Sequence, residues 1–191
     1  MPTDAELPSL HARALVATGP IVAGVPAAGL DDASVCEGWS VRELLNHVVS
    51  GNWWVPELVS GRTIAEVGDR LDGDLLGADY VAAYQGSADA AAAAFQQPGA
   101  MERPVAVSYG PVPGSVYCGH RFIDVLVHGW DLARSTGQDT TLDPDLVQAC
   151  WEVVEPELEG FEASGAFGSA VTVPDGADLQ TRLLAALGRQ T

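Results

Sequence analysis

The chain has few basic residues, few cysteines and no long apolar run. Its 191 residues include 26 acidic and only 9 basic side chains, which gives a formal net charge of −17. Phosphate backbones and anionic lipid surfaces repel so acidic a chain, so nucleic-acid binding and membrane-surface binding are disfavoured. Because the sequence holds no run of about 18 apolar residues, we expect no membrane span. The first residues are acidic and lack an apolar core, so we expect no signal peptide.

Cysteine is scarce and unpaired in the sequence. The three cysteines, Cys36, Cys118 and Cys150, are widely spaced and odd in number, and no Cys-x-x-Cys motif occurs. This usage argues against a disulfide framework and indicates a reducing compartment, where thiols serve as small buried side chains. We therefore expect a cytoplasmic protein. For 191 residues, the expected organisation is a single domain over residues 1–191 with a substantial core.

The alternation of strands and helices that is typical of a parallel sheet is also absent. Apolar residues recur instead at helical spacing, between loops rich in glycine and proline. The segment from Ser40 to Glu43 matches a capping box and predicts a helix start. Helices are expected over residues 4–22, 40–56, 78–97, 115–136, 143–159 and 179–187. Residues 60–78 should form a loop with one short helical turn, and residues 103–114 an extended loop or small hairpin. The tail from Gly160 should be loose up to the helix expected over residues 179–187. The pattern predicts an all-α fold, an up-down four-helix bundle with an extra C-terminal helix and an extended loop.

The most informative segment runs from His120 to Asp131. Within it, Asp124 and His128 lie four residues apart in an apolar, helix-compatible run. Positions i and i+4 share a helix face, so the carboxylate and the imidazole point the same way, as in helical metal sites. His47 lies at the edge of the apolar stripe of another expected helix. Two packed helices could therefore bring His47, Asp124 and His128 to one metal ion.

Each of these three residues also has a simpler interpretation. His47 could be a half-buried histidine bonded to a backbone carbonyl. Asp124 could form an ion pair with Arg121, three residues before it. His128 could form a packed polar pair with Asp124 without any metal.

The neighbouring polar residues are open to alternatives as well. Asp131 could orient the ring of His128 as a hydrogen-bond acceptor, or it could pair with a nearby arginine such as Arg134. His120 could be an extra ligand, a proton carrier or an exposed helix residue, of which we favour the last. His11 has no visible partner, so we expect it at the surface.

A few further positions bear on packing. Trp39 and Trp130 are expected in the core. Gly129 would permit the close approach of another element. Tyr109 and Tyr117 could line a pocket, although no spacing argument places them there.

Two strings of the sequence resemble motifs of a known family. Residues 36–47, Cys-Glu-Gly-Trp-Ser-Val-Arg-Glu-Leu-Leu-Asn-His, are similar to the CxGWTVRDLLxH opening of the mycothiol-dependent maleylpyruvate isomerase N-terminal domain proteins. These actinobacterial proteins are a branch of the DinB-like superfamily. Residues 124–133, Asp-Val-Leu-Val-His-Gly-Trp-Asp-Leu-Ala, are similar to the family's (D/E)xxxHxWDLA segment. Residues 98–103 and 110–114 also resemble its single-domain metal-binding members, so the resemblance covers nearly the whole chain.

The resemblance implies a four-helix bundle of the DinB/YfiT type that binds a divalent metal. The metal is most often zinc, with nickel or iron as alternatives, and the implied ligands here are His47, Asp124 and His128. A low-molecular-weight thiol such as mycothiol is the implied organic cofactor, and many relatives are homodimers. The isomerases carry a further α/β domain after the bundle, so this chain is expected to lack part of their thiol or substrate pocket.

Three protein ligands leave a coordination position open, which is the arrangement of catalytic metal sites. One possible function is a metal-dependent thiol S-transferase or isomerase, because a metal deprotonates a coordinated thiol, which can then act on an electrophile. A second is a metal-dependent hydrolase that activates water. A third is a non-enzymatic metal-binding or stress-related module. Two histidines and a carboxylate also resemble the facial triad of iron oxygenases, which we rank below zinc.

Overall fold

The structure is a computed structural model that describes residues 1–164 and 168–191. The chain divides into two compact units, one of residues 4–140 and one of residues 1–3 with residues 141–191. The expected single domain over residues 1–191 stays a prediction. The described residues are mostly helical and include one antiparallel two-stranded sheet. The all-α expectation is therefore confirmed only as a mostly helical fold.

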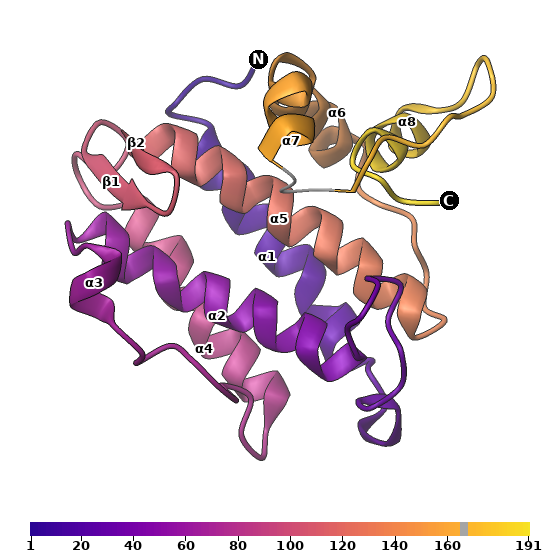
Figure 1. Ribbon diagram of the computed structural model, residues 1–191, viewed down its shortest axis with the longest axis horizontal. Helices are drawn as coiled ribbons and strands as arrows, with labels where there is room; N and C mark the ends of the chain where they lie inside the picture. Colours follow the sequence, from indigo (N-terminus) through magenta and orange to yellow (C-terminus); the bar gives the residue numbers. More distant parts are fainter. Residues whose placement is uncertain (165–167) are drawn as a thin grey trace. The chain divides into compact units, whose positions relative to one another are not determined.

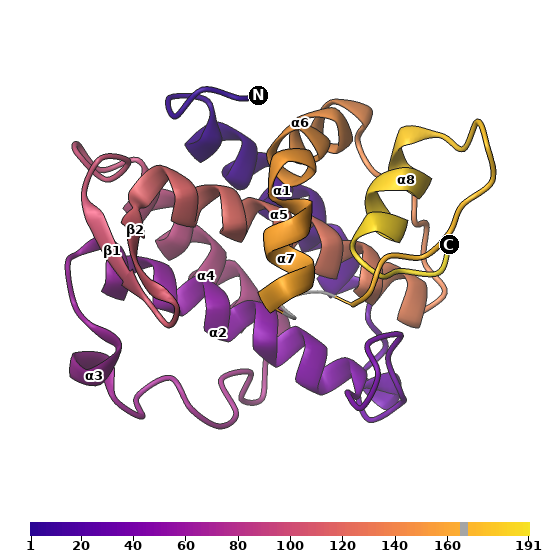
Figure 2. The same cartoon turned by 45° about the horizontal axis from the view of Figure 1, so that its top comes forward.

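Four long helices build the larger unit: α1 (Leu7–Ala23), α2 (Val41–Val59), α4 (Tyr80–Phe95) and α5 (Gly114–Ser135). Helices α1 and α2 each pack against both α4 and α5 (Figures 1 and 2). The apolar side chains of all four helices meet in one core, whose largest fully buried members include Leu44, Leu45, Tyr84, Phe95, Phe122 and Ile123. The contact between α2 and α5 is the one that positions the candidate site.

The start of α2 is fixed by the predicted capping box. The Ser40 hydroxyl accepts a hydrogen bond from the Glu43 backbone N–H at 3.2 Å, and the Glu43 carboxylate accepts one from the Ser40 N–H at 2.8 Å. A cap of this kind stabilises a helix by about 1 kcal/mol. It also sets the helical phase of His47, which lies about two turns further on. Pro56 lies inside α2, which continues to Val59.

Helix α5 is buried on most of its surface, which explains its long apolar run. At Gly129, a Cβ would lie 2.6 Å from the Thr18 hydroxyl of α1. The same hydroxyl donates a hydrogen bond to the Val125 carbonyl at 3.5 Å. The prediction that Gly129 permits the close approach of another element is confirmed.

The connections of the larger unit are short elements. The 3-10 helix η1 (Ala27–Gly29) follows α1, and α3 (Ile64–Val67) is the short helical turn predicted within residues 60–78. Strands β1 (Pro104–Val107) and β2 (Gly110–Pro113) form an antiparallel hairpin directly before α5. Of the two forms expected for residues 103–114, the chain therefore adopts the hairpin.

The smaller unit contains α6 (Pro144–Val154), the 3-10 helix η2 (Glu155–Glu157), α7 (Leu158–Ser164) and α8 (Leu179–Ala186), with α6 packed against α8. The expected continuous helix over residues 143–159 is wrong. Pro156 lacks a backbone N–H, and the α-helix gives way to a 3-10 turn there. The expected loose tail from Gly160 is also wrong up to Ser164, while residues 165–167 of that segment lie outside the described residues. None of the described helices is both long and apolar enough to cross a membrane.

Candidate metal centre

His47 of α2 and the pair Asp124 and His128 of α5 converge where these two helices pack. One ligand atom from each residue lies within 4.8 Å of the other two. The Nε2 atom of His47 is 3.3 Å from Oδ1 of Asp124, and Nε2 of His128 is 3.7 Å from the same oxygen. Three ligands of one divalent ion need spacings of this size. The structure thus brings together all three residues singled out from the sequence, and their assignment as ligands stays a prediction.

Arg121 keeps Asp124 in its ionised form. Its Nη1 donates to Oδ2 of Asp124 at 2.9 Å, so the ion pair considered from the sequence is present. Burial alone would raise the pKa of Asp124. The positive charge of Arg121 opposes that effect, and electrostatic attraction by His128 and the hydrogen bond with His47 act in the same direction as Arg121. Together they outweigh burial and hold the pKa of Asp124 well below its ordinary value. Because the ion pair uses Oδ2, Oδ1 still faces both histidines, and ion pairing is compatible with metal ligation.

Two residues of α2 hold Arg121 in place. The Oδ1 atom of Asn52 accepts a hydrogen bond from Nη2 of Arg121 at 3.3 Å, and Nδ2 of Asn52 donates to the Ser87 hydroxyl at 3.3 Å. Gly51 leaves the space in which the guanidinium lies, because a Cβ there would be 2.6 Å from Cζ of Arg121. The sequence reasoning missed both residues. An asparagine four positions after Val48, on the apolar stripe of α2, was the available signal for Asn52.

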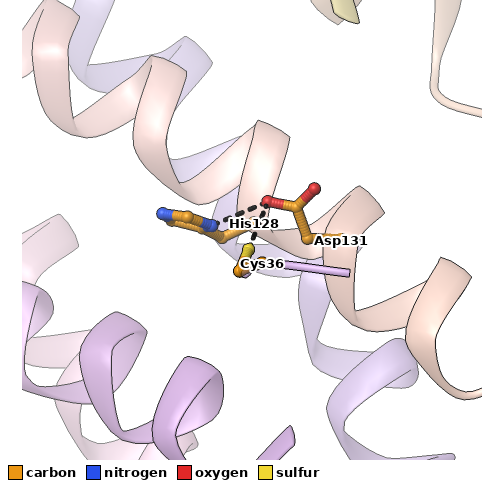
Figure 3. Close-up of side chains that lie close together, drawn as sticks. All are labelled: Cys36, His128 and Asp131. Carbon is orange, nitrogen blue, oxygen red and sulfur yellow. Dashed lines mark hydrogen bonds and ion pairs between the residues drawn. The ribbon is translucent and has the colours of Figure 1, made fainter. Parts of the chain in front are cut away.

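Asp131 sets the orientation of the His128 ring. Its Oδ2 lies 2.8 Å from Nδ1 of His128 (Figure 3). Because an ionised carboxylate only accepts hydrogen bonds, this contact places the ring hydrogen on Nδ1 and leaves the lone pair of Nε2 for the side of Asp124 and His47. Of the two roles considered for Asp131, the structure therefore supports the orienting one. The same Oδ2 atom accepts a hydrogen bond from Sγ of Cys36 at 3.4 Å.

The centre opens to solvent beside Trp39. The His47 side chain is 38% exposed, whereas that of His128 is only 10% exposed. The Trp39 ring lies against His47, with the ring centroids 4.9 Å apart. The expectation that Trp39 is a core residue is wrong, because it belongs to the loop before α2 and stays 36% exposed. Trp130 is buried, as expected.

The two remaining histidines lie outside the candidate centre. His120 is half-buried rather than exposed, and its Nδ1 is 2.6 Å from the hydroxyl of Tyr109. His11 was expected at the surface but is fully buried, with its ring edge-on to Phe95. Burial, aided by the charge of Arg121, lowers the pKa of His11 to about 3, so the ring is neutral. Its place four residues after the buried Leu7 was the sequence signal for an inward position.

Two of the three thiols are inert. Cys118 and Cys150 are buried, as predicted, and none of the three cysteines forms a disulfide. Burial raises the pKa of the Cys118 thiol to about 12 and also raises that of Cys150. Neither can supply a thiolate near neutral pH. Cys36 differs because it is half-buried and lies beside the candidate centre.

Sequence comparisons give a family assignment for the larger unit. Residues 11–133, more than half of the chain, match the family model described as mycothiol maleylpyruvate isomerase N-terminal domain. Two uncharacterized proteins of Mycobacterium tuberculosis, from strain CDC 1551 / Oshkosh and strain H37Rv, are each 39% identical to this chain over 157 residues. The match covers 78% of this chain and 80% of each relative.

Solved structures show the same fold. Two crystal structures of a mycothiol-dependent maleylpyruvate isomerase, one of them of a mutant, match with TM-scores of 0.75 and 0.73 at 16% and 17% identity. Each match covers 99% of this chain and 90% of the isomerase chain. This coverage contradicts the expectation that a further domain of the isomerases is missing from this chain, whereas the expected loss of part of their thiol or substrate pocket stays a prediction. The chain belongs to the mycothiol maleylpyruvate isomerase N-terminal domain family.

Proposed function

We propose that this protein binds one divalent metal ion, preferably zinc, and acts with a low-molecular-weight thiol of the mycothiol type as an isomerase or S-transferase. The ligands would be His47, Asp124 and His128. The observation that carries the proposal is the convergence of these three ligand atoms within 4.8 Å of one another. Membership of a family named for a mycothiol-dependent isomerase supports the thiol. We also propose that the four-helix bundle has up-down topology and that the protein is cytoplasmic.

The donor set fits a metal of this kind. Two imidazole nitrogens and one carboxylate oxygen are a ligand set of catalytic zinc sites. Metal ligands must be deprotonated at the binding atom. Arg121 holds Asp124 as a carboxylate, and Asp131 holds the His128 ring with its Nε2 lone pair directed inward. Asp124 and His128 are therefore each held by a neighbouring residue of α5 in the protonation state that metal binding requires.

The side chains around the centre define where a small molecule can approach. Asn52 and Arg121 occupy the buried Oδ2 side of Asp124. The half-exposed ring of His47 and the ring of Trp39 form the solvent side, so a thiol or an electrophile would arrive there. A bound metal would supply a Lewis acid that lowers the pKa of a thiol at its open position.

The first test is the metal content of tag-free protein, measured by elemental mass spectrometry. We expect at least one zinc ion per chain in the wild-type protein and one ion fewer per chain in the His47→Ala variant. His120→Ala is the matched control, because His120 bonds to Tyr109 and contributes no atom to the group of three ligands. Absence of metal from the wild-type protein after incubation with zinc would refute the proposal.

The second test concerns the thiol. Turnover of maleylpyruvate or a related electrophile should require both the metal and added mycothiol. Turnover of ester or amide substrates without any thiol would assign the centre to a hydrolase instead. A bound metal with no turnover in either assay would identify a non-enzymatic binding protein.

A further inference from the structure

We propose that Cys36, Asp131 and the Nδ1 side of His128 form a second metal site, separate from the centre above. It would take a thiophilic divalent ion such as zinc, cadmium or cobalt(II). These three residues offer a sulfur, an oxygen and a nitrogen atom that all lie within 4.8 Å of one another. Figure 3 shows the three side chains turned toward one another at this point. The site uses neither His47 nor Asp124.

The distances within this group are close to those of a tetrahedral site. Zinc binds sulfur at about 2.3 Å and nitrogen or oxygen at about 2.0–2.2 Å, which places neighbouring ligand atoms about 3.3–3.6 Å apart. The separation between Sγ of Cys36 and Oδ2 of Asp131 is 3.4 Å and already fits. The separation between Nδ1 of His128 and Oδ2 of Asp131 is 2.8 Å and must widen by about half an ångström.

The chemistry of the donors favours a thiophilic ion. A thiolate and a carboxylate carry the two negative charges that balance a divalent cation, and the soft sulfur selects zinc or cadmium over magnesium or calcium. Without an ion, the S–H of Cys36 and the N–H of His128 both donate to Asp131. An ion would replace these two hydrogens. The Cys36 proton leaves to solvent, and the His128 hydrogen moves from Nδ1 to Nε2, or also leaves to solvent when Nε2 binds the ion of the first centre. Asp131 is fully buried, and buried carboxylates are paired or bind metal.

The loop that carries Cys36 is fixed to α5 beside Asp131. The backbone N–H of Val35 donates to the hydroxyl of Ser135 at 3.0 Å, and that hydroxyl donates to the backbone carbonyl of Asp131 at 2.7 Å. The hydroxyl of Ser34 accepts from the backbone N–H of Cys36 at 3.2 Å. These contacts hold the sulfur above the turn of α5 that carries Asp131. Because Cys36 is only half-buried, an ion can reach the sulfur from solvent.

The two groups share His128 without sharing a ligand atom. Nε2 of His128 faces Asp124, whereas Nδ1 faces Asp131. The imidazole ring would therefore bridge two ions as an imidazolate when both sites are filled. The second site can also be filled alone, because its three ligand atoms do not depend on His47.

Titration of metal-free protein with cobalt(II) tests this site, because a cysteine thiolate bound to cobalt(II) gives a charge-transfer absorption band in the near ultraviolet. We expect this band in the wild-type protein. The Cys36→Ser variant should lose the band while still binding cobalt(II) at the first centre. The His47→Ala variant should keep it. Cys118→Ala is the matched control for loss of a thiol and should also keep the band.

Two outcomes would overturn the second site. Absence of the band from folded wild-type protein would reduce the contact between Cys36 and Asp131 to a hydrogen bond. A band that disappears in His47→Ala would mean that Cys36 joins a single site with His47. Failure of the first centre is distinguishable, since Cys36→Ser would then bind no cobalt(II) while His47→Ala still shows the band. Circular dichroism of each variant verifies that it is folded.

Discussion

The guanidinium group of Arg121 lies against Gly51, at the contact between α5 and α2. A Cβ at position 51 would be 2.6 Å from Cζ of Arg121, closer than side-chain atoms approach in folded proteins. Glycine in the middle of a helix costs about 0.5–1 kcal/mol relative to alanine. Its presence here is explained by the space that Arg121 needs in order to reach Asp124.

The Gly51→Ala variant should therefore be destabilised. The added methyl group displaces a buried guanidinium that pairs with Asp124, and overpacking of this kind costs about 1–3 kcal/mol. Urea unfolding of metal-free protein measures the change. Gly86→Ala is the matched control, because Gly86 is exposed in the middle of α4. A Cβ there would make only an ordinary van der Waals contact, 3.9 Å from Cζ2 of Trp53. That control should gain about 0.5–1 kcal/mol. An equal gain in Gly51→Ala would show that Arg121 does not depend on this space.

Local patterns predicted much of this architecture. The capping box placed the start of α2, and the spacing of Asp124 and His128 placed them on one face of α5. Both features depend only on residues a few positions apart, so the sequence carries them directly. The packing of α2 against α5 near the candidate site was predicted because His47 lies at the edge of the apolar stripe of its helix.

Features that depend on distant residues were not predicted. The burial of His11 results from how α1, α4 and α5 pack, and no short-range pattern encodes that packing. The roles of Gly51 and Asn52 exist only because Arg121 arrives from another helix. Trp39 was placed in the core because tryptophan is usually buried, but its loop lies at the surface and leaves the ring beside His47.

The Asp131→Asn variant should weaken binding at the first centre. An amide retains the shape of the side chain but loses the charge that orients His128, and loss of such a partner typically lowers metal affinity 10–100-fold. Competition with a zinc chelator measures the affinity, and a Cys36→Ser background restricts the measurement to the first centre. Asp89→Asn, an exposed change on α4, is the control and should leave the affinity unchanged. An unaltered affinity in Asp131→Asn would refute the orienting role.

Stability should fall with acid because of His11. Its pKa in the folded protein is lowered from 6.5 to about 3, so between these values the unfolded chain binds a proton that the folded chain does not. The free energy of unfolding therefore decreases as the pH falls through this window, by at most about 1.4 kcal/mol per pH unit. Asp124, whose folded pKa is lowered, stabilises the fold above its ordinary pKa and loses that effect only below about pH 4.

The His11→Leu variant should show a shallower loss of stability between pH 6.5 and pH 4.5, measured by urea unfolding at several pH values. At pH 7.5 its stability should equal or exceed that of the wild-type protein, because neither ring nitrogen of His11 has a hydrogen-bond partner in the described structure. A slope identical to that of the wild-type protein would mean that His11 gains a proton without unfolding.

Trp39 should report metal binding through its fluorescence. Its ring centroid lies 4.9 Å from that of His47 and 6.2 Å from that of His128, so a paramagnetic ion at the first centre would quench it at short range. In a Cys36→Ser background, which restricts cobalt(II) to the first centre, the ion should therefore quench tryptophan fluorescence, and Trp39→Phe should remove most of that quenching. Trp53→Phe is the matched control, because Trp53 approaches Gly86 of α4 instead, and it should leave the quenching nearly intact. Equal quenching in both variants would mean that the ion does not lie beside Trp39. The ligand set of His47, Asp124 and His128 would then need revision.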